Sequence, residues 1–235
     1  MTTCRATTSI GLALSLGLVA CGGGDDATQQ TASSNFYGTY SDQTGAEGTI
    51  MLAGQQQVVS ADLLAPGTES TLSGTLQIVG QGAVTLTGTY DSTDGTIVFS
   101  GPPSYSFQGT VDTKTAVGTG NGPNGSSVFV LFHGGTDGSV DTYCGTAVCT
   151  APAGCDLLVD LTLSVETGTA LLTVSVNQTV FIGAGTATAS TVDFHITQGG
   201  IDVTIHGAID GNTVAGTWSD AINGASGTFS AGTCF

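Results

Sequence analysis

The sequence predicts an all-β protein built as two tandem, duplicated antiparallel barrels. Of its 235 residues 37 are Gly, and Thr, Val and Ile are abundant after residue 35, where strong helix formers are scarce. Short runs that alternate apolar and polar residues lie between glycine-containing turns, which is the pattern of a strand meander. About eight such runs fall in each half, and eight antiparallel strands close naturally into a small barrel. The alternative that this pattern permits is a single two-sheet β-sandwich.

The first residues have the pattern of a signal peptide. Residues 1–9 carry one positive charge and no acid, and the apolar run 10–20 follows them. Because about 20 apolar residues are needed to span a bilayer, this run has the length of a signal-peptide core instead. We therefore expect residues 1–20 to be removed.

The apolar run ends in the four residues LVAC, 18–21, and three glycines and two aspartates come next. This stretch resembles the lipobox of bacterial lipoproteins. The resemblance implies that the sulfur of Cys21 carries lipid and that the acyl chains anchor the protein in the cell envelope. The residue after the cysteine is Gly22, which by the same resemblance favours the outer membrane, with the body on its periplasmic face or at the cell surface. The polar segment 21–34 predicts a flexible linker.

The mature chain is strongly acidic. Without the signal peptide, Lys114 is the only Lys or Arg against 18 Asp and Glu, which gives a net charge of −17. Such a surface repels phosphate backbones and excludes nucleic acid as a partner. It also repels anionic lipid, so we expect membrane contact through the lipid anchor only. The identity of any protein or small-molecule partner does not follow from the charge.

Four cysteines remain in the body, and all of them lie in its second half: Cys144, Cys149, Cys155 and Cys234. An even number in an oxidising compartment predicts two disulfides. In a closed meander the first and last strands of the second half are neighbours, so a Cys144–Cys234 bridge would close the seam and Cys149–Cys155 would close a loop. Four cysteines allow three pairings, and the sequence alone does not choose among them. We place the first barrel at 35–140 and the second at 141–235.

Residues 191–230 allow a prediction of strand register. Two-residue turns at Gly199-Gly200, Gly211-Asn212 and Asn223-Gly224 tolerate the positive φ that tight hairpins require. With these turns every pair on one face is apolar or glycine, which a slip of one residue would destroy. The predicted pairs are Phe194–Ile205, Ile196–Val203, Ile205–Trp218, Gly207–Gly216, Ile209–Val214 and Trp218–Phe229. We expect the paired glycines to make room for the Trp218 ring.

The two halves also share a sequence pattern. Residues 107–130 align with 205–230, and this indicates an internal repeat. At a constant offset Gly109, Asp112, Thr115, Gly118 and Thr119 match Gly207, Asp210, Thr213, Gly216 and Thr217. With small gaps, Phe129 matches Phe229.

One group of side chains has the chemistry of a metal site. Strand alternation places Asp193, His195 and His206 on one face, with Asp193 opposite His206. Two imidazoles and a carboxylate suit zinc or copper, although a solvated polar face explains the same residues. We therefore predict no cofactor, with zinc or copper as the alternative. No nucleophile elbow or other catalytic constellation is visible, so the sequence does not indicate an enzyme.

The segment LTGTYDS, 86–92, is similar to a hairpin of avidin-type biotin-binding barrels. Tyr90 and Ser92 match positions that contact the ligand in that family. The several binding tryptophans of the family have no counterpart, because the only tryptophan is Trp218. The resemblance therefore implies the barrel architecture and not biotin binding.

Two functions from different classes are compatible with these observations. The first is a non-enzymatic structural or interaction module on the bacterial envelope, because the body is acidic, rich in turns and without catalytic clusters. The alternative is a carrier for a small ligand or metal. A carrier needs a lined cavity, whereas a structural module fills its barrels with side chains.

Overall fold

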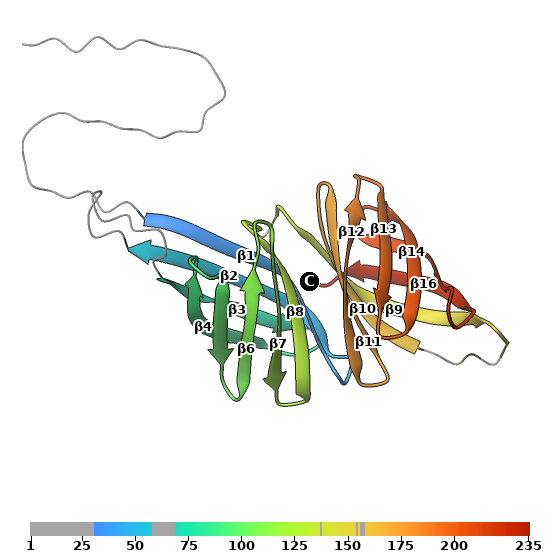
Figure 1. Ribbon diagram of the computed structural model, residues 1–235, viewed down its shortest axis with the longest axis horizontal. Coiled ribbons are helices and arrows are strands. Elements are labelled where there is room, and N and C mark those ends of the chain that lie inside the picture. Colours follow the sequence, from blue (N-terminus) through green and yellow to red (C-terminus); the bar gives the residue numbers. More distant parts are fainter. Residues whose placement is uncertain (1–30, 58–68, 137, 154, 156–157) are drawn as a thin grey trace, which may run out of the picture.

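A computed structural model describes residues 31–57, 69–136, 138–153, 155 and 158–235. The chain forms two closed antiparallel barrels of eight strands each, as the sequence predicts, and the barrels lie side by side (Figure 1). The predicted signal peptide and the lipid-attachment residue Cys21 lie outside the described residues. The first strand begins at Thr31, so the predicted linker, 21–34, ends a few residues too late.

Each strand pairs with its neighbours along the chain, and the first strand of each barrel pairs with the last. The first barrel consists of β1 (Thr31–Asp42), β2 (Glu47–Gln57), β3 (Glu69–Ile78), β4 (Ala83–Asp91), β5 (Thr96–Gly101), β6 (Tyr105–Val111), β7 (Thr115–Gly122) and β8 (Gly125–His133). The second consists of β9 (Asp141–Ala151), β10 (Leu158–Glu166), β11 (Thr169–Val176), β12 (Thr179–Ala187), β13 (Thr191–Gln198), β14 (Ile201–Asp210), β15 (Thr213–Asp220) and β16 (Ala225–Thr233). Within the described ranges, no helical segment has the length and apolarity that a membrane crossing requires.

The predicted register is right at two of the three turns. Phe194 lies opposite Ile205 across β13 and β14, and Ile205 opposite Trp218 across β14 and β15. Gly207 lies opposite Gly216, also as predicted. The third pair is wrong, because Trp218 lies opposite Gly227 and Phe229 lies opposite Gly216.

A four-residue turn causes this difference between β15 and β16. Asp220 pairs with Ala225, so residues 221–224 form the turn in place of Asn223-Gly224 alone. The Asp220 carboxylate accepts hydrogen bonds from the backbone N–H of Ile222 at 3.0 Å and from the Asn223 side chain at 2.6 Å. This side-chain cap stabilises a longer turn, which an Asn-Gly pair does not reveal.

The paired glycines make room for a phenylalanine ring, and not for Trp218 as expected. A Cβ atom on Gly207 would lie 2.6 Å from Cζ of Phe229. The same arrangement recurs in the first barrel, where Gly109 pairs with Gly118 and a Cβ on Gly118 would lie 2.5 Å from Cζ of Phe129. The strands that carry the repeated sequence thus occupy equivalent places in the two barrels.

Both predicted disulfides are present, and both lie in the second barrel. Cys144–Cys234 joins β9 to the residue that follows β16, across the seam of the barrel. Cys149–Cys155 joins the end of β9 to the connection before β10. The structure thus selects one of the three pairings that the sequence left open.

The barrels pack against each other through the outer faces of β1, β2 and β8 and those of β9, β10, β11 and β12. Val130, Phe132 and Leu171 form an apolar cluster there. Beside it, Thr39 of β1 and Thr173 of β11 are fully buried although they point out of their own barrels. The interface is therefore a close-packed mixture of apolar and hydroxyl side chains.

Candidate functional site: an apolar cavity in the second barrel

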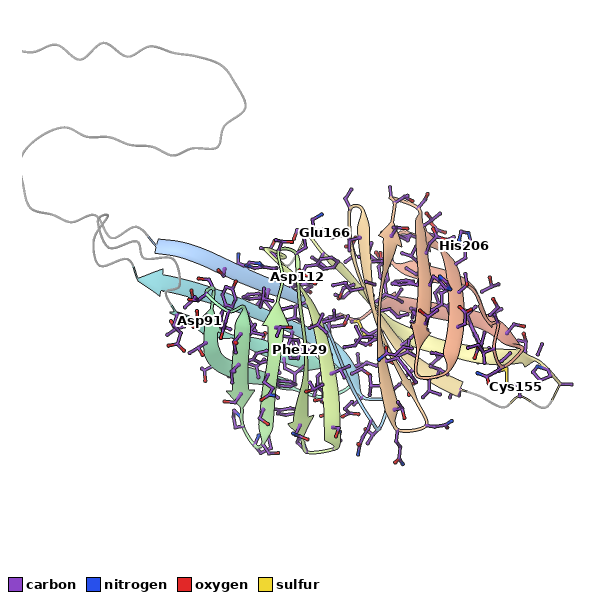
Figure 2. All side chains as sticks on the ribbon, viewed as in Figure 1. Asp91, Asp112, Phe129, Cys155, Glu166 and His206 are labelled. Carbon is purple, nitrogen blue, oxygen red and sulfur yellow. A yellow bond between two sulfur atoms is a disulfide. The ribbon has the colours of Figure 1, made fainter. Side chains whose placement is uncertain are left out.

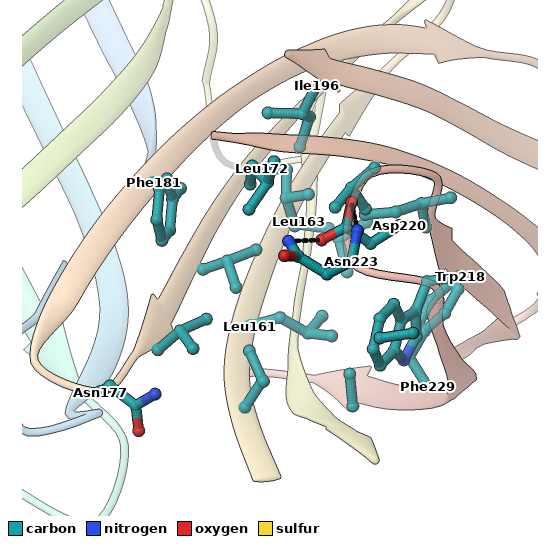
Figure 3. Close-up of a pocket in the computed structure, with 18 residues that line it drawn as sticks. Leu161, Leu163, Leu172, Asn177, Phe181, Ile196, Trp218, Asp220, Asn223 and Phe229 are labelled. Atoms are coloured by element: carbon teal, nitrogen blue, oxygen red, sulfur yellow. Dashed lines mark hydrogen bonds between the residues drawn. The ribbon is translucent and has the colours of Figure 1, made fainter. Parts of the chain in front are cut away.

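A cavity of about 340 Å³ occupies one end of the second barrel (Figure 3). This volume lies within the range of small-molecule sites. Nearly all of its lining side chains are apolar, and they come from all eight strands of the barrel and from two of its turns. The lining residues are Ala147, Val159, Leu161, Leu163, Leu172, Val174, Val176, Asn177, Phe181, Ile196, Ile201, Val203, Ile205, Trp218, Asp220, Asn223, Ala225 and Phe229.

The cavity is closed at one end and open at the other. Tyr143, Phe194 and Val214 are buried in the core but do not line the cavity, so they fill the closed end. Exposed Asn177 and Asn223 mark the mouth, where they belong to the β11–β12 and β15–β16 turns. Side chains therefore fill one end of the interior of this barrel, and the cavity occupies the other end.

Strand register explains how the interiors of the two barrels differ among the residues that the structure describes. Tyr40 lies opposite Phe129 in the first barrel, and the equivalent residue opposite Phe229 is Ala147. Phe107 of β6 precedes the paired glycine Gly109 by two residues. Ile205 of β14 precedes the equivalent glycine, Gly207, by two residues.

Two residues further back, Tyr105 of β6 corresponds to Val203 of β14. Together with the two exchanges on β9 and β14, three aromatic rings of the first barrel are replaced by smaller aliphatic side chains. All three of the smaller side chains line the cavity.

The same rings pack closely in the first barrel. The Phe107 ring stacks on Phe99 with their centroids 4.7 Å apart, and it meets Tyr40 edge-on at 6.0 Å. Tyr40 also meets Tyr105 at 6.5 Å. Phe129, labelled inside this barrel in Figure 2, is fully buried. Aromatic side chains therefore occupy the volume that is open in the second barrel.

Asp220 is the only ionisable residue among the described residues that line the cavity, and both oxygens of its carboxylate already accept hydrogen bonds. One oxygen accepts hydrogen bonds from the backbone N–H of Asp202 at 3.2 Å and of Ile222 at 3.0 Å, and the other accepts from the Asn223 amide at 2.6 Å. Burial by itself would raise the pKa of Asp220, but these hydrogen bonds outweigh it and lower the pKa below its usual value. Asp220 therefore stabilises the turn as a carboxylate.

Trp218 contributes the largest ring of the cavity wall. Its indole N–H donates to the carbonyl oxygen of Val148 at 3.2 Å, which anchors the ring against β9. A Cβ atom on Gly227, directly opposite, would lie 2.8 Å from the indole nitrogen. The absence of a side chain at Gly227 thus lets the ring lie flat across two strands.

The three residues that suggested a metal site lie on the outer surface and do not converge. His206, labelled in Figure 2, bonds to Asp193 through its Nδ1 atom, and these two side chains face each other as predicted. His195 bonds instead to Asp202, with 2.7 Å between Nε2 and the carboxylate oxygen. In the part of the chain that the structure describes, no three His, Cys, Asp or Glu side chains form a group that could hold a metal ion.

The two residues that resemble ligand contacts of avidin-type barrels lie far from the cavity, in the first barrel. Tyr90 is 8% exposed and packs edge-on against Phe36 at 5.4 Å. Ser92 is exposed in the turn after β4. Tyr90 thus belongs to the filled core of the first barrel.

A buried carboxyl group lies between the barrels and was not expected from the sequence. Glu47 at the start of β2 accepts a hydrogen bond from Thr162 of β10 at 3.3 Å. Burial, and then the nearby Asp160 carboxylate, raise the pKa of Glu47 to about 8, although hydrogen bonds from Thr162 and Gly145 act in the opposite direction. Glu47 therefore holds a proton at neutral pH.

Comparisons with protein-family models, with curated proteins and with solved structures found no match for this chain. The functional argument therefore rests on the geometry of the cavity. Its signal was present in the sequence, where Phe107 aligns with Ile205 and the segment FYGT, 36–39, aligns with YCGT, 143–146, so that Tyr40 corresponds to Ala147. Only the strand register shows that these positions face the interior of a barrel.

Proposed function

We propose that this protein is a lipid-anchored, non-enzymatic envelope protein that binds a small apolar ligand in its second barrel. The cavity of about 340 Å³ supports this proposal, because a lined cavity is the feature that separates a carrier from a structural module. The first barrel would serve as a rigid, filled body beside it. The lipobox at Cys21 is the basis for the anchor and for the proposed outer-membrane location.

A carrier is favoured over a catalyst by the chemistry of the lining. Catalysis by acid–base or nucleophilic chemistry needs a titratable or nucleophilic side chain free to reach the reacting atoms. Asp220, the single carboxylate among the described lining residues, already accepts hydrogen bonds from its own turn and from Asp202. The remaining side chains offer hydrocarbon surface and two amides.

Binding can be measured with a reporter that the chain already carries. Trp218 is the only tryptophan and lines the cavity, so its fluorescence should shift when a hydrocarbon displaces water from the ring. We would titrate straight-chain alcohols of increasing length into the full chain carrying Cys21→Ser, which removes the need for detergent. Each added methylene should tighten binding roughly fourfold until the cavity is full, since a buried CH₂ contributes about 0.8 kcal/mol.

A variant that fills the cavity provides the control. Ala147→Tyr introduces the side chain that the first barrel has at the equivalent position and should abolish the fluorescence response. Val98→Tyr adds the same ring to the outer face of β5, where Val98 is 46% exposed, and should leave binding unchanged. The proposal fails if no alcohol binds, or if Ala147→Tyr binds as the parent does.

A further inference from the structure

We infer that the ligand of the second barrel is an amphiphile with a hydrocarbon body and an uncharged polar end, such as a long-chain alcohol or a glycerol monoester. This inference rests on the proposed function and narrows it to one ligand class. The hydrocarbon would lie among the apolar side chains of the cavity, and the polar end would remain at the mouth between the β11–β12 and β15–β16 turns.

The second barrel has no cation to offer a negatively charged ligand. Residues 141–235 contain eight Asp and Glu and neither Lys nor Arg. The only lysine of the body, Lys114, lies in the β6–β7 turn of the other barrel. A carboxylate or phosphate at the mouth would lose hydration without gaining an ion pair, in a field that is already negative.

The two histidines of this barrel do not change that conclusion. His195 and His206 lie on the outer face of β13 and β14, opposite in direction to the cavity residues Ile196 and Ile205. Each imidazole is already bonded to a carboxylate, His195 to Asp202 and His206 to its cross-strand partner. Neither ring is therefore placed to neutralise an anion at the mouth.

A cationic end is disfavoured for a different reason. Asp220 is the one carboxylate among the described lining residues, and the residue is 6% exposed. Both of its oxygens accept hydrogen bonds from the turn that it caps, including one of 2.6 Å from the Asn223 amide. An ammonium group would have to replace these bonds and disrupt the turn.

The groups that remain at the mouth are neutral amides. Asn177 lies in the β11–β12 turn with φ of 49°, a conformation that Asn tolerates well, and its exposed side chain borders the cavity (Figure 3). Asn223 donates through its nitrogen to Asp220, which leaves its carbonyl oxygen to accept. An amide N–H and an amide oxygen complement a hydroxyl or an ester, and neither requires a charge.

The test compares three probes with the same hydrocarbon chain: decanol, decanoate and decylammonium, each kept monomeric and near neutral pH. Trp218 fluorescence of the full chain carrying Cys21→Ser reports the dissociation constant of each probe. We expect decanol to bind about tenfold more tightly than either ion, or better. Decanoate should recover affinity in acid, once its own carboxyl group is protonated.

A charge at the mouth should change this preference. Asn177→Lys replaces one mouth amide with a cation and should shift the preference between decanoate and decanol about tenfold toward decanoate. Asn212→Lys is the matched control, because it adds the same charge in the exposed β14–β15 turn, at the opposite end of the barrel. It should alter neither constant.

The outcomes separate the two proposals. If decanoate or decylammonium binds within tenfold of decanol, the ligand class assigned here is wrong, whereas binding in the cavity stands. The assignment also fails if both lysine variants improve decanoate binding equally, since net charge and not the mouth would then be responsible. If none of the three probes binds, the proposed function itself is wrong.

Discussion

The two barrels share strand number, order and register, but they differ in what fills them and in what cross-links them. Seven buried aromatic side chains form part of the interior core of the first barrel among the described residues, and residues 31–140 contain no cysteine. The second barrel keeps an open cavity of about 340 Å³ and has both disulfides. Barrels with the same number and order of strands therefore support either a filled or a hollow interior.

The difference shows that closure of the sheet and filling of the core are separable. Cavity formation weakens a protein because lining atoms lose their packing partners. The Cys144–Cys234 bridge lies across the seam where the first and last strands of the second barrel meet. We interpret the disulfides as offsetting the packing that the cavity removes.

The largest effect is expected from removal of the seam disulfide. Cys144 and Cys234 are 90 residues apart, and in the chain-entropy model a loop of this size contributes roughly 4–5 kcal/mol. The double variant Cys144→Ser/Cys234→Ser should lower the stability of the second barrel by that order. Denaturant unfolding followed through Trp218 measures it.

The second disulfide provides the control for this prediction. Cys149 and Cys155 are only 6 residues apart, so their removal should cost about half as much. Equal losses for the two double variants would contradict our view that closing the seam is what stabilises the hollow barrel.

A second prediction transfers the cavity to the other barrel. Tyr40→Ala removes a ring that is 1% exposed and that packs on Phe107, so it should destabilise the first barrel by about 3–5 kcal/mol. Ala147→Tyr, the reverse exchange, should leave the second barrel as stable or more stable. Calorimetry of both variants measures their loss of stability. If Ala147→Tyr lowered the stability as much as Tyr40→Ala, the claim that this position is filled in the first barrel and open in the second would be wrong.

A third prediction concerns the contact between the barrels and its dependence on pH. The native pKa of Glu47 is about 8, against 4.5 for an unperturbed group. Between these values the folded protein holds a proton that the unfolded chain has released, so stability falls as pH rises through this window and levels off above it. Below about 4.5 both states are protonated and this contribution is constant.

Glu47→Gln should remove this pH dependence and stabilise the protein above pH 8 by about 1–3 kcal/mol, the usual cost of a buried group without adequate partners. Glu69→Gln is the matched control, because Glu69 is exposed at the start of β3. Unfolding midpoints across the pH range would contradict the prediction if the two variants had the same profile.

The smallest effect is expected on the outer face of the second barrel. The side chains of His206 and Asp193 are 67% and 52% exposed, and exposed ion pairs contribute little. His206→Gln should change the stability by no more than about 0.5 kcal/mol and leave the alcohol affinity unchanged. A loss of ligand binding in this variant would show that the outer face, and not the cavity, holds the ligand.

Much of the fold was readable because tight turns fix register. Gly199-Gly200 and Gly211-Asn212 each allow only a short hairpin, so the pairing of Phe194 with Ile205 followed from the alternation of apolar residues. The pairing after Asp220 did not follow, because a side-chain cap selected a turn of four residues. The prediction therefore placed Phe229 opposite Trp218, whereas Phe229 lies opposite Gly216.

The candidate site was less accessible to sequence reasoning. Ala147, Val203 and Ile205 are ordinary core residues in any strand, and nothing in their local pattern distinguishes a filled barrel from a hollow one. Their meaning depends on the ring that stands at the equivalent position of the other barrel. The buried carboxyl group of Glu47 was missed for a related reason, because it is covered by a strand more than 100 residues away.

The sequence by itself determined the β architecture, the pattern of about eight strands in each half and the supply of cysteines, because these depend on alternation, turn residues and composition, which act over a few neighbouring residues. Only the tertiary structure decided the disulfide pairing, the turn after Asp220 and the cavity. A cavity is the volume that side chains from eight strands leave unfilled where they meet at the barrel axis. The sequence of any single strand does not determine that volume.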